Sequence, residues 1–100
     1  ALQPFLRHPR VLGLGEVMNY PGVLYGDEGV MKKMALVRGG ICDGHGPGIS
    51  GSDLNAYLAA GVTSDHEATT WQEGIEKIRR GCYLMLREAT CWNCCSALHR

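Results

Sequence analysis

Four ionisable residues stand at or near the ends of short apolar segments of this chain. They are Glu16, His45, His66 and Glu88. Neutral imidazole and carboxylate groups are ligands for Zn²⁺, Mn²⁺ and Fe²⁺. A single histidine at the end of a strand is more often a hydrogen-bonded structural residue, but four such placements in one small chain favour a shared site. They predict a divalent metal site, if the segments that carry them lie side by side.

Apolar segments that read as strands alternate with segments that read as helices. The predicted strands are residues 11–17, 41–45, 62–66 and 82–88. Predicted helices occupy residues 28–38, the stretch before Gly61 and the stretch before Gly81, and the tail from Ala89 could begin a fourth. The segment MNYPGVLYG is predicted to be a loop. Strict alternation predicts an α/β fold with about four parallel strands and three to four helices, which we treat as one unit over residues 1–100.

Side chains that can accept a hydrogen bond from free backbone amides mark the starts of these helices. Asp27 is expected to cap the first, and Ser52 or Asp53 the second. Thr70 and Glu73 fit a capping box, in which the Thr70 hydroxyl and the Glu73 side chain each accept a hydrogen bond from a free backbone amide at the start of the helix.

The predicted sheet brings the ionisable residues together. Ligands of parallel α/β folds bind at the carboxyl ends of the strands, where the loops and helix N-termini gather. Side chains alternate along a strand, so Asp43 shares a face with His45, and Ser64 shares a face with His66. We therefore expect Glu16, His45 and His66 to converge.

Composition restricts the partners of the chain. Its 100 residues carry ten basic and ten acidic side chains, so no positive field favours nucleic acid or an anionic membrane. The odd number of cysteines, five, suits a reducing compartment, and we expect a cytoplasmic protein without a membrane span. Cys91, Cys94 and Cys95, with His99, could bind zinc, act in redox chemistry or lie on a helix of small residues.

Three segments carry a resemblance to a known family. They are GLGEVMNYPGVLYGD, DGHGPGISGSDLNAYLAAGVTSDHEATT and YLMLREAT. They closely resemble bacterial adenine deaminases of the amidohydrolase superfamily, from about residue 10 to residue 90. The family usually has DGHAPG where this chain has DGHGPG, whereas SDHE is unchanged. The tail CWNCCSALHR departs from the family pattern.

The resemblance implies part of a (β/α)8 barrel, strands four to seven, with a metal centre at their carboxyl ends. It implies that Glu16 bridges two divalent ions (Mn, Fe or Zn) and that His45 and His66 each bind one. Glu16 and Glu88 are the implied catalytic residues. Asn19, Tyr20 and Arg87 are the implied substrate-binding residues for adenine. In the implied reaction, water activated by the metal pair attacks C6 of adenine, ammonia leaves and hypoxanthine remains.

Two parts of the family's site have no counterpart in this sequence. The 100 residues contain no His-x-His pair, which the first strand of the family supplies, and no match to the Asp of its eighth strand. Four strands do not close a barrel. The chain is therefore part of a longer enzyme, a half-barrel that pairs with itself or with the remaining barrel segments, or a non-catalytic oligomeric module that keeps metal ligands by descent.

Overall fold

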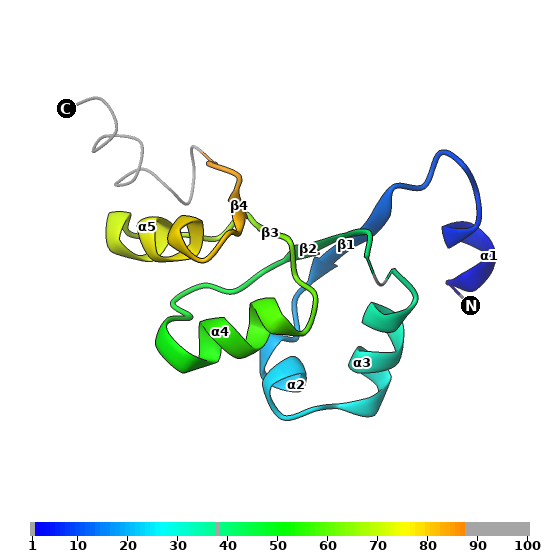
Figure 1. Ribbon diagram of the computed structural model, residues 1–100, viewed down its shortest axis with the longest axis horizontal. Coiled ribbons are helices and arrows are strands. Elements are labelled where there is room, and N and C mark those ends of the chain that lie inside the picture. The colour runs from blue at the N-terminus through cyan, green and yellow to red at the C-terminus, as the bar shows by residue number, and fades with distance from the viewer. Residues whose placement is uncertain (1, 38, 88–100) are drawn as a thin grey trace.

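A computed structural model of the chain describes residues 2–37 and 39–87. Within these residues, four parallel strands form one sheet in the order β1-β2-β3-β4 (Figure 1). The strands are β1 (Gly13–Val17), β2 (Ile41–Gly44), β3 (Ser64–Asp65) and β4 (Tyr83–Leu84). The predicted α/β fold with four parallel strands is confirmed, and it is consistent with part of a barrel. Each strand is shorter than predicted, because pairing with its neighbours covers only part of each predicted range.

The three predicted helices are present, and two short helices accompany them in the described part of the chain. The former are α3 (Glu28–Ala35), α4 (Gly51–Ala59) and α5 (Trp71–Arg79); the latter are α1 (Gln3–Leu6) and α2 (Tyr20–Leu24). The prediction of a loop over MNYPGVLYG is wrong at α2. Asn19 accepts a hydrogen bond from the Gly22 amide and so caps the helix. Pro21 stands in the first turn, where a backbone N–H would have no acceptor within the helix, so the lack of one in proline does not destabilise it. The tail from Ala89 lies outside the described residues.

The helix starts confirm two of the predicted caps and correct the third. Asp27 accepts from the Val30 amide at 2.9 Å, and Thr70 accepts from the Glu73 amide at 3.2 Å. The assignment of Ser52 or Asp53 as a cap is wrong, because α4 already begins at Gly51. The Gly51 amide instead donates to Glu76 Oε1 of α5 at 2.8 Å, so an acceptor far away in sequence takes the capping role.

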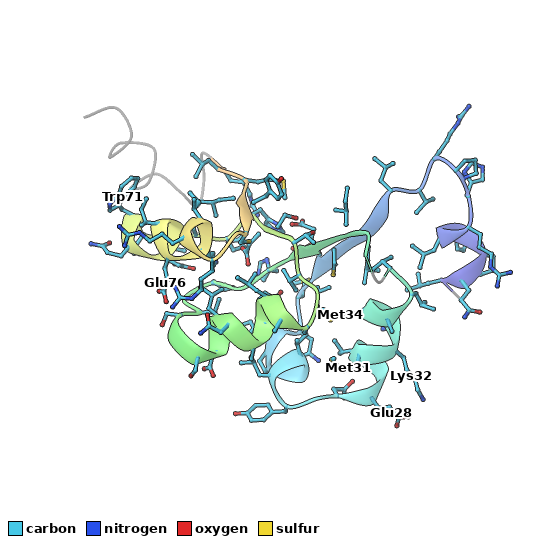
Figure 2. The ribbon with its side chains drawn as sticks, viewed as in Figure 1. Glu28, Met31, Lys32, Met34, Trp71 and Glu76 are labelled. Carbon is cyan, nitrogen blue, oxygen red and sulfur yellow. The ribbon has the colours of Figure 1, made fainter. Side chains whose placement is uncertain are left out.

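The core lies where α2, α3 and α4 cover one side of the sheet (Figure 1). The buried apolar residues that form this core are Val17, Val23, Met34, Cys42, Ile49, Leu54, Tyr57 and Val62. Figure 2 shows the two sides of α3: Met31 and Met34 lie toward α2 and α4, whereas Glu28 and Lys32 point outward. This amphipathic pattern is typical of a helix that covers one face of a sheet.

Several large apolar side chains near the strands remain exposed. They include Leu12, Ile41, Tyr83, Met85 and Leu86. In the described residues β1 and β4 are the two edges of the sheet, so their outer backbone groups meet no further strand there.

The helices of this part of the chain fall short of the length and apolar content that a membrane crossing requires.

Candidate metal centre

An irregularity in β1 aims Glu16 toward the neighbouring strands. Leu14 is paired with Cys42 and Val17 with Gly44, so three steps along β1 match two along β2. The extra residue forms a β-bulge, and within it Glu16 adopts a φ of 45°. A non-glycine residue in this left-handed region costs on the order of 1–3 kcal/mol, and such strain gathers at functional sites. Simple alternation along the strand does not anticipate this geometry.

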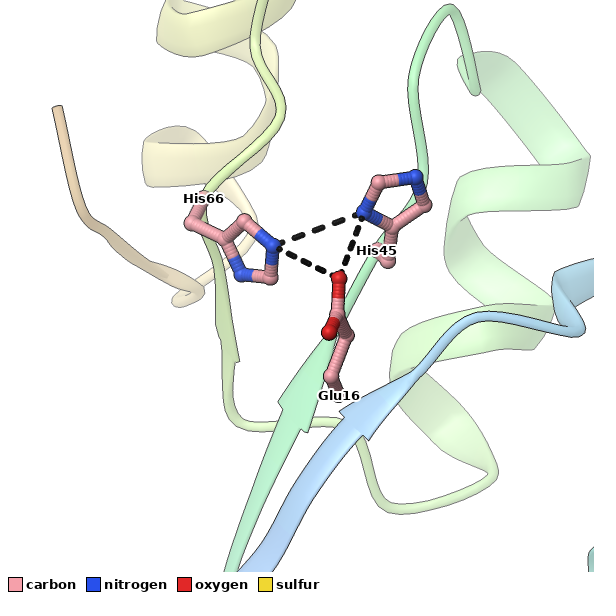
Figure 3. Close-up of side chains that lie close together, drawn as sticks. All are labelled: Glu16, His45 and His66. Carbon is pink, nitrogen blue, oxygen red and sulfur yellow. Dashed lines mark hydrogen bonds and ion pairs between the residues drawn. The ribbon is translucent and has the colours of Figure 1, made fainter. Parts of the chain in front are cut away.

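Glu16, His45 and His66 converge, as their positions at the strand ends predicted. Figure 3 shows the three side chains forming a triangle above the carboxyl ends of β1 and β2. His45 Nδ1 lies 3.2 Å from Glu16 Oε1 and 3.4 Å from His66 Nε2. His66 Nε2 lies 3.3 Å from the same Glu16 oxygen. Three side chains, one from β1 and two from the loops that follow β2 and β3, are thus brought within reach of a single ion.

The spacing of these atoms fits a divalent cation. Ligand atoms about 2.1 Å from a tetrahedral ion lie roughly 3.4 Å from one another. The observed separations of 3.2, 3.3 and 3.4 Å agree with this value. Two nitrogens and one carboxylate oxygen are also a ligand set that Zn²⁺, Mn²⁺ and Fe²⁺ accept. The Glu16 side chain is 47% exposed, against 12% for His66, so the site is open on the glutamate side.

His66 is held from behind by groups on the two inner strands. Its Nδ1 lies 3.0 Å from Asp43 Oδ2, and the Ser64 hydroxyl donates to Asp43 Oδ1 at 2.8 Å. Asp43 and Ser64 are directly paired across β2 and β3. The sequence placed Asp43 on the same face as His45, but its contact is with the histidine of the next strand.

Tyr57 of α4 joins the ends of β1 and β2. Its hydroxyl donates to the Val17 carbonyl at 2.8 Å and accepts from the His45 amide at 3.0 Å. The side chain is fully buried, and this burial raises the pKa of the hydroxyl well above its usual value. The hydroxyl therefore stays neutral and serves as both donor and acceptor. Gly44 leaves room for it, since a Cβ there would lie 2.9 Å from Tyr57 Oη.

A buried ionic network supports the loop that follows His45. Lys77 of α5 is fully buried, and its ammonium donates to the Gly46 carbonyl at 2.7 Å and to Glu73 at 3.1 Å. Asp65 lies 3.4 Å from the same ammonium and accepts from the Gly46 amide at 2.9 Å. Glu73 Oε1 also accepts from the Gly48 amide at 2.8 Å. The loop is therefore hydrogen-bonded, through Gly46 and Gly48, to side chains of α5 and β3.

Glu73 does not close the predicted capping box but accepts several other hydrogen bonds. Its second carboxylate oxygen accepts from both the amide and the hydroxyl of Thr69 at 3.0 Å. Burial by itself would raise the pKa of Glu73. The donors at Thr69, Gly48 and Lys77 outweigh that effect and hold the pKa below its ordinary value.

The predicted substrate-binding residues lie at different distances from the triangle. Asn19 caps α2 and shares with Glu16 a cavity of about 250 Å³. Tyr20 packs edge-on against Tyr57, with 6.3 Å between ring centroids. Arg87 is ion-paired with Glu67, and Glu88 lies outside the described residues.

Glu67 is a site residue that reasoning from the sequence missed. Its Oε1 lies 3.9 Å from both His45 Nδ1 and His66 Nε2, and its side chain is nearly buried. Its place directly after His66 in the sequence was the available signal. Paired with Arg87, it supplies a second carboxylate beside the two ring nitrogens.

The two cysteines in the described part of the chain do not join the site. Cys42 and Cys82 are buried. Burial raises the pKa of both thiols, that of Cys82 to about 11, so neither is a thiolate at neutral pH. Both therefore behave as small buried apolar residues. Cys91, Cys94 and Cys95 lie outside the described residues.

Comparison with known proteins confirms the predicted resemblance. The chain is 58% identical over 89 residues to adenine deaminase 2 of Carboxydothermus hydrogenoformans. It is 52% identical over 89 residues to the adenine deaminase of Cereibacter sphaeroides strain KD131, and 49% over 90 residues to adenine deaminase 1 of Rhizobium johnstonii. These matches cover 89–90% of this chain but only 16% of each relative. No family model matches the chain.

Proposed function

We propose that this chain contributes a divalent metal centre to an adenine deaminase, which converts adenine and water into hypoxanthine and ammonia. The observation that carries the proposal is the triangle of Glu16, His45 and His66, at separations that fit one ion. The high identity to proteins named adenine deaminase supports adenine as the substrate. Mn²⁺, Fe²⁺ and Zn²⁺ are the candidate metals, and the family resemblance implies that Glu16 would hold a pair of these ions.

The residues of the site have separate proposed roles. A bound divalent cation supplies a nucleophilic hydroxide from water at neutral pH. Glu16, His45 and His66 would hold that cation, and the open side at Glu16 leaves space for the substrate. Asn19 lines the adjoining cavity, which supports its proposed role in binding the purine. Arg87 neutralises Glu67 beside the two histidines.

Two complementary measurements test this function. The first is ammonia release from adenine by the purified 100-residue chain with Mn²⁺ or Fe²⁺. The second places the chain in adenine deaminase 2 of Carboxydothermus hydrogenoformans, in exchange for the matched segment. We expect the exchange protein to deaminate adenine, and we expect Glu16→Gln and His66→Ala to abolish this. Glu28→Gln, an exposed residue paired with Lys32 on α3, is the control that should keep activity.

The same measurements separate deamination from the alternative, an oligomeric metal-binding module. A folded, metal-loaded exchange protein without turnover would contradict the proposed enzyme. If the chain alone binds metal, but neither the chain nor the exchange protein deaminates adenine, the oligomeric metal-binding module is favoured. The exposed apolar residues near the edge strands support association with further barrel segments or with a second copy. A stable monomer in size-exclusion chromatography with mass detection would count against self-association.

A further inference from the structure

The position of one proton on His66 decides what its other ring nitrogen can bind. A neutral imidazole has one N–H donor and one acceptor nitrogen. An ionised carboxylate only accepts hydrogen bonds, so the contact of 3.0 Å between Asp43 Oδ2 and His66 Nδ1 requires the hydrogen to lie on Nδ1. In the neutral ring, Nε2 is then left with its lone pair.

That lone pair faces the Glu16 carboxylate oxygen, which is an acceptor, and a ring nitrogen of His45. Nε2 of His66 lies 3.3 Å from the Glu16 carboxylate oxygen and 3.4 Å from His45 Nδ1. A lone pair facing a carboxylate oxygen at this distance is unfavourable unless a positive charge lies between them. Coordination of a divalent cation would remove the repulsion, because the lone pairs of both ring nitrogens and of the carboxylate oxygen would then all point at one positive ion.

Asp43 is itself fixed in the orientation this requires. Its Oδ1 accepts from the Ser64 hydroxyl at 2.8 Å, and the two residues are direct partners across β2 and β3. With one oxygen held by Ser64, the other remains aimed at His66. The His66 side chain is 12% exposed and that of Asp43 21%, so solvent competes weakly for this contact.

We propose that Asp43, oriented by Ser64, is a positioning residue that holds the proton of His66 at Nδ1 and presents the Nε2 lone pair to a divalent cation. This inference rests on the proposed function, since it concerns the same metal centre. Carboxylates that orient ligating histidines in this way raise metal affinity, and their loss typically costs 10- to 100-fold.

The test measures Zn²⁺ affinity by calorimetry on the full 100-residue chain at one fixed pH, together with the proton position by ¹⁵N NMR of His66. We expect Asp43→Ala to weaken Zn²⁺ binding about 10- to 100-fold. Asp43→Asn keeps an oxygen acceptor without the charge, so it should lie between wild type and alanine. Ser64→Ala should lose less than Asp43→Ala. Asp53→Asn, an exposed aspartate in the first turn of α4, should bind as wild type does.

The NMR measurement needs no variant and so decides the inference even if Asp43→Ala does not fold. A proton on Nδ1 of His66 in the wild type supports it, and a ring protonated only at Nε2 overturns it. Unchanged Zn²⁺ affinity in a folded Asp43→Ala also overturns it. If the exchange protein does not deaminate adenine, the proposed function fails, while the proton position of His66 still decides the role of Asp43.

Discussion

Replacing Lys77 with methionine tests whether the buried ionic network holds the fold together. Methionine has nearly the length of the lysine stem, so packing is largely kept while the charge is lost. The Lys77 side chain is fully buried, and its partners Asp65 and Glu73 are only 2% and 7% exposed. Removing one member of a buried ion pair costs about 3–5 kcal/mol, because the other is left unpaired. Two carboxylates would be left here, so we expect a loss at the upper end of that range.

This loss is large against the total stability of a domain of this size, which is on the order of 5–15 kcal/mol. Urea unfolding followed by far-ultraviolet circular dichroism measures it. With a slope of roughly 1–2 kcal/mol per molar urea, the midpoint should fall by about 2 M or more, or the variant should be unfolded in buffer. Lys32→Met is the matched control. Its pair with Glu28 is exposed on α3 and should contribute only about 0.2–0.5 kcal/mol.

A triple variant separates the charge effect from a general intolerance of substitution at α5. Combining Lys77→Met with Asp65→Asn and Glu73→Gln removes all three charges, so no unpaired charge stays buried. It should therefore be more stable than Lys77→Met alone. The reasoning is refuted if Lys77→Met lies within about 1 kcal/mol of wild type, or if the triple variant is less stable than the single one.

Three further perturbations act on the supports of the site. The pKa of Glu73 in the folded chain lies below its ordinary value of 4.5, so ionised Glu73 stabilises the fold. This contribution to the free energy of unfolding should be complete above pH 4.5 and should be lost as the pH drops through the folded pKa. Glu73→Gln should therefore weaken the dependence of stability on pH in this acid range. Tyr57→Phe leaves the Val17 carbonyl and the His45 amide without their partner, and should cost about 1–3 kcal/mol in urea unfolding. Gly44→Ala puts a methyl group 2.7 Å from a Val62 methyl carbon and should cost roughly 1–3 kcal/mol, whereas no loss in thermal unfolding would show that the strands can move apart.

Much of the fold was readable from local patterns. Apolar runs, helix caps such as Asp27 and Thr70, and glycine stops depend on neighbours within a few residues, so the order of strands and helices follows from the sequence. The convergence of Glu16, His45 and His66 also followed, because parallel strands bring their carboxyl ends to one edge. The short helix α2 was missed, since Pro21 and Gly22 indicate a turn as readily as a first helical turn capped by Asn19.

Only the tertiary structure decided how those ligands are aimed and held. The bulge that turns Glu16 depends on the register between β1 and β2, which no local pattern specifies. Asp43 meets His66, and Lys77 meets Gly46 31 residues away, through contacts between separate elements. Residue types at strand ends therefore indicate which side chains can bind a metal. The distances between these side chains, and the buried groups that support them, arise only when the strands and helices pack together.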